Sequence, residues 1–140
     1  MNFIIENEKE LGEYVWAELS EKLKPGFKCA LVGDLGAGKT TLVKEIAHKL
    51  NINDHITSPT FNLRKEYEID NDVYLQHIDL YRHQNKLADD SEVSEWLADP
   101  RAISFVEWPS KMSGDLSIYD LVINIEVIGQ TRRKVDLEWS

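Results

Sequence analysis

The chain has 140 residues, enough for one compact domain over residues 1–140 and too few for two independent ones. Its 42% apolar and 29% charged residues exclude the composition of a disordered chain. The formal charge of −9 disfavours a broad electrostatic grip on nucleic-acid phosphates or on an anionic membrane. No apolar stretch approaches the roughly 18 residues that span a bilayer, so we expect a cytoplasmic protein that contacts nucleic acid only indirectly.

The first half of the chain alternates helical and strand-like patterns. A helix is predicted over residues 7–24, with Asn7 as its cap and Pro25 beyond its end. Residues 27–33 form an apolar run without helical period, which suits a strand buried on both faces. Cys29, the only cysteine, reads there as a buried small hydrophobe. Helical spacing returns over residues 39–50, so the glycine-rich segment before it joins a strand to a helix.

The second half of the chain is richer in strands. We expect a helix over residues 91–98, and a tight turn at Gly129 before the last strand. Strands are expected over residues 61–70, 73–81, 102–108, 121–127 and 132–139. This order predicts an α/β fold: a three-layer arrangement with a mostly parallel sheet, antiparallel hairpins and helices on both faces. The strand order does not follow from the sequence.

The octet "GDLGAGKT", residues 33–40, matches Gly-x-x-x-x-Gly-Lys-Thr. Glycines reach positive φ and let main-chain amides approach a ligand, and the start of a helix adds partial positive charge, so the segment suits a polyphosphate. Lys39 would neutralise phosphates and the Thr40 hydroxyl would bind Mg²⁺, which predicts a P-loop NTPase type of fold. The alternative is a tight turn without a ligand.

Two acidic residues can complete such a site. Glu107 ends an apolar strand, where its carboxylate would emerge at the ligand side of an open α/β sheet and hold Mg²⁺ with Thr40; otherwise it is an exposed strand-end acid. Asp79 is a candidate base that orients water or a second metal partner, or else an acid paired with Arg82. His77 lies two residues earlier on the same strand face, but no further Cys or His completes a zinc set.

Other residues near these motifs keep two interpretations each. Residues 57–60, "TSPT", suit either a γ-phosphate sensor or a plain turn. Trp108 suits either the core or a nucleotide lid. Arg82 suits either an arginine finger or an ion pair. The basic cluster that begins at Arg132 is typical of a solvated hairpin end.

The motifs "GDLGAGKTT", "TSPTF", "HIDLYR" and "FVEWP", in this order and spacing, resemble those of the TsaE (YjeE) family of bacterial P-loop ATPases. The resemblance implies slow, partner-dependent ATP hydrolysis in support of threonylcarbamoyl modification of the tRNA adenosine beside the anticodon. It implies ATP and Mg²⁺ as ligands and the proteins TsaB and TsaD as partners, with tRNA met only through their complex. Carried across, the candidate catalytic residues are Lys39, Asp79 and Glu107, and residues 57–60 form a switch-like segment. The resemblance also implies a set of residues that hold the nucleotide phosphates: Leu35, Gly36, Ala37, Gly38, Lys39, Thr40 and Thr41.

The base of the nucleotide is less well defined than its phosphates. The resemblance points to residues 7–9 and to Arg132 for adenine. The guanine-reading Asn-Lys-x-Asp is absent, because residues 85–89, "NKLAD", hold one residue too many, so ATP is preferred over GTP. A small-molecule kinase and a nucleotide-gated binding module with negligible turnover remain the alternative functions.

Overall fold

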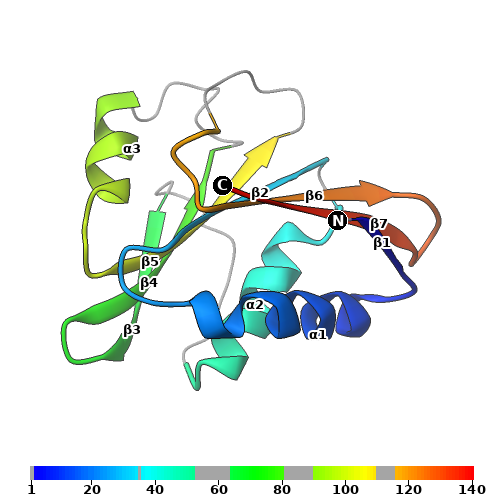
Figure 1. Ribbon diagram of the computed structural model, residues 1–140, viewed down its shortest axis with the longest axis horizontal. Coiled ribbons are helices and arrows are strands. Elements are labelled where there is room, and N and C mark those ends of the chain that lie inside the picture. The colour runs from blue at the N-terminus through cyan, green and yellow to red at the C-terminus, as the bar shows by residue number, and fades with distance from the viewer. Residues whose placement is uncertain (1, 35, 53–63, 81–89, 110–115) are drawn as a thin grey trace.

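The computed structural model describes residues 2–34, 36–52, 64–80, 90–109 and 116–140. These residues build one seven-stranded sheet with the strand order β1-β7-β6-β2-β5-β4-β3 (Figure 1). The strands are β1 (Asn2–Ile5), β2 (Lys28–Gly33), β3 (Arg64–Asp70), β4 (Val73–Asp79), β5 (Ala102–Pro109), β6 (Leu121–Val127) and β7 (Arg133–Trp139).

The sheet combines parallel strands with antiparallel hairpins, as predicted, but parallel pairs are not in the majority. The four central strands β6, β2, β5 and β4 run parallel to one another. At one side β3 pairs antiparallel with β4, and at the other β7 pairs antiparallel with β6 and with β1. Three of the six neighbouring pairs in the described sheet are therefore antiparallel, because a hairpin flanks the parallel centre on each side and β1 extends one of them.

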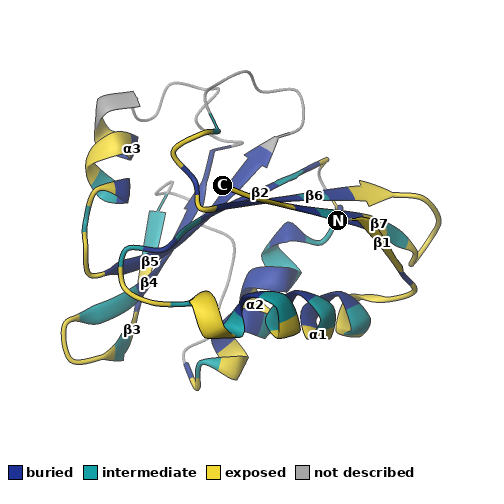
Figure 2. Ribbon diagram, viewed as in Figure 1, coloured by how far each residue is buried: buried dark blue, intermediate teal, exposed yellow. Residues whose placement is uncertain are grey.

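Helices cover both faces of the sheet, as predicted. α1 (Glu8–Leu19) and α2 (Lys39–Lys49) lie on one face, and α3 (Asp90–Leu97) lies on the other (Figure 1). β2 shows why a strand between two layers has an unbroken apolar sequence: Cys29 and Leu31 belong to the core under α1 and α2, while Ala30 belongs to the core under α3. The central strands are accordingly buried (Figure 2).

The first helix begins as predicted and ends earlier. The Asn7 side chain accepts a hydrogen bond from the Glu10 amide at 2.9 Å, which caps the start of α1. The predicted helix ran to residue 24, but α1 ends at Leu19 and a 3-10 turn, Ser20–Lys22, follows. Such tightening of the last turn is common at helix ends. Within the described ranges, the helices are too short or too polar to span a bilayer.

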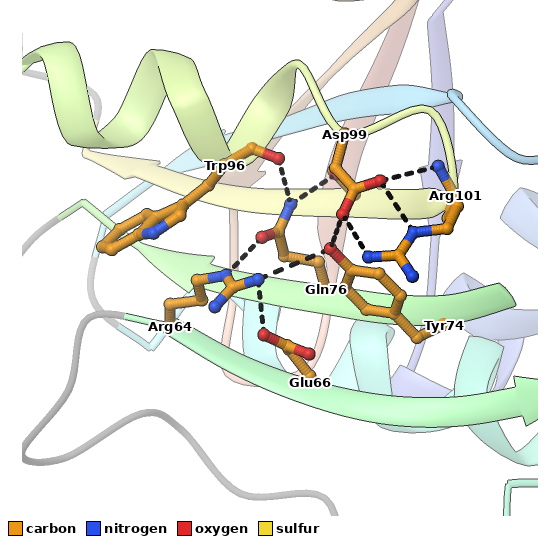
Figure 3. Close-up of polar contacts among 8 residues, drawn as sticks. Arg64, Glu66, Tyr74, Gln76, Trp96, Asp99 and Arg101 are labelled. Carbon is orange, nitrogen blue, oxygen red and sulfur yellow. Dashed lines mark hydrogen bonds and ion pairs between the residues drawn. The ribbon is translucent and has the colours of Figure 1, made fainter. Parts of the chain in front are cut away.

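A polar network fastens α3 to the sheet (Figure 3). The Gln76 side-chain amide donates to the Trp96 carbonyl at 3.1 Å and to the Ser104 hydroxyl at 2.9 Å. Arg64 of β3 donates to the Gln76 carbonyl oxygen, and its guanidinium lies 5.5 Å from the centre of the Trp96 ring. One buried amide thus joins β4, β5 and α3, with Arg64 covering it from β3.

A second part of the network closes the segment between α3 and β5 (Figure 3). Tyr74 donates to the Asp99 carboxylate at 2.6 Å, and the Arg101 main-chain amide donates to it at 2.9 Å. The pKa of Asp99 is well below its usual value because the side chains of Arg101 and Tyr74 donate hydrogen bonds to the carboxylate. Tyr74 pairs with Ala102 near the amino ends of β4 and β5. This network therefore lies at the opposite edge of the sheet from the carboxyl ends of these strands.

Candidate functional site

The glycine-rich loop connects the end of β2, Gly33, to the start of α2, Lys39. Gly36 and Gly38 have φ values of 84° and 110°, in the left-handed region that favours glycine. A Cβ on Gly33 would lie 2.6 Å from the Ile125 carbonyl oxygen of β6, so a side chain does not fit there. The glycines therefore meet two needs, an unusual backbone path at Gly36 and Gly38 and a close strand approach at Gly33.

Lys39 begins α2 and is folded back over the loop. Its side chain donates to the Gly33 carbonyl, and the residue is only 6% exposed. Burial lowers the pKa of Lys39, and the carboxylates of Glu107, Asp79 and Asp34 oppose that shift. A negatively charged phosphate at this place would favour the protonated form of the buried lysine, as the three carboxylates do.

Thr40 and Glu107 meet at the start of α2. The Thr40 hydroxyl lies 2.9 Å and 2.8 Å from the two carboxylate oxygens of Glu107. Glu107 comes from β5 and is 5% exposed, so it is not the exposed strand-end acid of the alternative interpretation. Phe105, two residues earlier in β5, belongs to the core under α1 and α2. Because side chains alternate along a strand, Glu107 lies on that same face.

Asp79 and His77 of β4 lie beside Glu107. Asp79 pairs in register with Glu107, is 8% exposed and acts electrostatically on Lys39. His77 is fully buried, and its Nε2 is hydrogen-bonded to a Glu107 carboxylate oxygen. The carboxyl ends of β2, β4 and β5 thus carry the loop, Asp79 and Glu107 at one edge of the sheet, as expected for open α/β sheets.

The two arginines at the beginning of β7 behave differently. Arg132 is exposed and pairs with Glu6 at 3.3 Å, which joins the last hairpin to the start of α1. Arg133 instead donates to the Ala37 carbonyl at 3.0 Å and to the Gly36 carbonyl at 3.3 Å. The arginine that contacts the loop is therefore Arg133, and the role in adenine binding that the resemblance implies for Arg132 stays a prediction.

The remaining predicted residues fall into two groups. Trp108 is buried in the core under α3, so the structure favours the core interpretation over the lid. Thr41 is half-buried in the first turn of α2. Outside the described residues lie Leu35, the segment 57–60 and Arg82, so their predicted roles stay predictions.

Sequence reasoning missed two residues at this site. Arg133 follows the predicted residue Arg132 in the sequence. Which of the two arginines faces the loop depends on the register of β7 in the sheet. His77 was noted only as a partner for zinc, and its contact with Glu107 depends on β4 and β5 being neighbours. The one available signal was the spacing of two between His77 and Asp79, which places both on one strand face.

The side chains at the site suit Mg²⁺, which needs few protein ligands, better than a metal ion that is enclosed by protein side chains alone. Thr40 and Glu107 supply hard oxygen atoms side by side, as Mg²⁺ prefers. Among the described residues, no group of three or more His, Cys, Asp or Glu side chains could enclose a metal. Two protein ligands suffice for Mg²⁺ when phosphate oxygens and water complete its coordination.

Fold and site together define a mixed α/β protein in which a glycine loop leads from the central strand β2 into a helix, beside buried acids at the ends of β5 and β4. The family model of threonylcarbamoyl adenosine biosynthesis protein TsaE matches residues 5–135. The chain therefore belongs to the TsaE family.

Curated relatives agree with this assignment. A protein of Aquifex aeolicus named tRNA threonylcarbamoyladenosine biosynthesis protein TsaE is 35% identical over 94% of this chain and 91% of its own length. A Bacillus subtilis protein of the same name is 37% identical over 80% of this chain and 69% of its own length. The crystal structure of Bacillus subtilis YdiB is also similar, with a TM-score of 0.67 and 27% identity over 96% of this chain and 82% of that one.

Proposed function

We propose that this chain is a P-loop ATPase that binds ATP with Mg²⁺ and hydrolyses it slowly in support of threonylcarbamoyladenosine formation on tRNA. The membership of the TsaE family supports the role in biosynthesis of that nucleoside. The observation that carries the nucleotide site is the contact of the Thr40 hydroxyl with both carboxylate oxygens of Glu107, directly behind a glycine loop. A threonine and an acid in this relation are the usual protein anchors of Mg²⁺ in P-loop enzymes.

The residues of the loop would hold the phosphates. Main-chain amides around Gly36 and Gly38 and the N-terminus of α2 offer donors and partial positive charge. Lys39 would exchange the Gly33 carbonyl for phosphate oxygens and neutralise part of their charge. Arg133 would keep the loop in shape through its bonds to the Gly36 and Ala37 carbonyls.

Thr40 and Glu107 are the residues that would hold Mg²⁺, which when bound neutralises charge on the phosphates. Asp79 stands beside Glu107 in the sheet and would accept a hydrogen bond from the attacking water and so orient it. Attack on the γ-phosphorus by this water breaks the bond to the β-phosphate oxygen and releases ADP and inorganic phosphate. Because Asp79 and Glu107 carry separate tasks, their loss should affect hydrolysis and Mg²⁺ binding differently.

We also propose that hydrolysis depends on protein partners. Support for this comes from the resemblance of the four sequence motifs to those of the TsaE family. The partners implied by the family resemblance are TsaB and TsaD, which would carry the tRNA. The formal charge of −9 supports this indirect contact with tRNA.

The proposal is tested by measuring phosphate release from ATP by the isolated chain and by the chain mixed with TsaB and TsaD. We expect slow release alone, faster release with both partners, and loss of Mg²⁺-dependent turnover in Glu107→Ala. Glu126→Ala is a control, because Glu126 is an exposed acid of β6. Brisk turnover by the chain alone, unchanged by the partners, would contradict partner dependence, and unchanged turnover of Glu107→Ala would remove Glu107 from the site.

Two further experiments test the alternative functions. A phosphorylated metabolite formed from labelled ATP and cell extract would favour a small-molecule kinase. A nucleotide-dependent complex with TsaB and TsaD that persists when Asp79→Asn stops hydrolysis would favour a binding module.

A further inference from the structure

His77 is a buried polar residue that the proposed mechanism does not use. It lies in β4 with no exposed surface, and its Nε2 is hydrogen-bonded to Oε2 of Glu107. Its other ring nitrogen, Nδ1, is buried without a hydrogen-bond partner. A fully buried imidazole with a single polar contact calls for an explanation in terms of that contact.

The contact fixes the form of the ring. Glu107 as a carboxylate can only accept hydrogen bonds, so the Nε2 atom of His77 must carry the proton and donate it. In the neutral ring Nδ1 is then an acceptor, and no buried N–H is left without a partner. The imidazole ring therefore donates one hydrogen bond to Glu107, and its other nitrogen makes none.

Glu107 receives hydrogen bonds from two sides. The Thr40 hydroxyl comes from the N-terminus of α2, and His77 comes from the neighbouring strand β4. A carboxylate held in this way has little freedom to turn away from Thr40. Residues that hydrogen-bond to a metal ligand commonly set its orientation, and their loss weakens metal affinity by about 10- to 100-fold.

We propose that His77 is a positioning residue for Mg²⁺: its Nε2–H holds the Glu107 carboxylate toward the Thr40 hydroxyl, so that both oxygens are ready for the metal that accompanies the nucleotide. This inference rests on the proposed nucleotide site. It differs from a purely structural role, because a merely packed imidazole would support the fold and leave the Mg²⁺ dependence of nucleotide binding untouched.

The test compares His77→Gln with His77→Asn. A glutamine amide can place an N–H where Nε2–H lies, whereas the shorter asparagine amide reaches only the position of Nδ1. The affinity of each variant for a non-hydrolysable ATP analogue is measured by calorimetry, once with Mg²⁺ and once with EDTA. Thermal unfolding without nucleotide reports the stability of each variant.

We expect Mg²⁺ to raise the affinity for the analogue by a similar factor in wild type and in His77→Gln. In His77→Asn this factor should be about 10- to 100-fold smaller, while the affinity measured in EDTA stays unchanged. Equal Mg²⁺ gains in all three proteins would overturn the inference and leave the proposed function intact. Equal losses in both variants, in step with lowered thermal stability, would show a structural role and would also overturn it. Failure of the wild type to bind the analogue at all would instead contradict the proposed function.

Discussion

Gly33→Ala tests how tightly the glycine loop is tied to the sheet. A Cβ at residue 33 would stand 2.6 Å from the Ile125 carbonyl oxygen and 3.1 Å from the Ala37 Cβ. Ordinary carbon–oxygen contacts begin at about 3.3 Å, so the two strands would have to part by about 0.7 Å. The Ile125 oxygen belongs to the backbone of β6, which pairs in parallel with β2, so no side-chain rotation relieves this contact.

Overpacking of this kind costs about 1–3 kcal/mol in the free energy of unfolding. With a urea m-value of about 2 kcal/mol/M, the unfolding midpoint should fall by about 0.5–1.5 M, as followed by tryptophan fluorescence. Gly129→Ala is the matched control, because its Cβ would meet nothing closer than the Arg132 Cβ at 3.5 Å. If Gly33→Ala and Gly129→Ala unfolded at the same urea concentration, the steric reasoning would be refuted.

Three further substitutions test the loop, the network under α3 and the core. Arg133→Met should weaken nucleotide binding by about 5- to 20-fold in calorimetry, since it removes two bonds to loop carbonyls, while Lys134→Met, at an exposed position of the same strand, should change it little. Asp99→Asn should lower the thermal midpoint at pH 7 and flatten its decline on acidification. The sign follows because a depressed carboxyl pKa adds stability above about pH 4 that is lost as pH falls further. Ile46→Ala, at a fully buried position, should cost about 2–5 kcal/mol by urea unfolding, against under about 1 kcal/mol for exposed Ile128→Ala.

Local sequence signals predicted most elements of the fold. The cap at Asn7 correctly indicated the start of α1, and the predicted strand over residues 121–127 agrees with β6. The continuous apolar runs correctly indicated strands covered on both faces. The order of the strands depends on which hydrophobic faces meet across the sheet, and no spacing within one strand reports that.

The candidate site was predictable where chemistry lies in one segment. Lys39 and Thr40 follow from the loop pattern itself, and Glu107 follows from its place at the end of a buried strand. His77 and Arg133 were missed because their roles depend on neighbours from other parts of the chain, Glu107 and the loop carbonyls. Contacts between distant segments are set by register, which is a property of the folded sheet.

The central claim is that the loop behind β2 receives the phosphates of a nucleotide, and titration of the chain with Mg²⁺-ATP in a calorimeter tests it most directly. Wild type should bind one equivalent, Lys39→Ala should bind about 10- to 100-fold more weakly because a charged donor to phosphate is lost, and Lys49→Ala, exposed at the end of α2, should bind as wild type does. Equal affinity of Lys39→Ala and wild type would contradict the account.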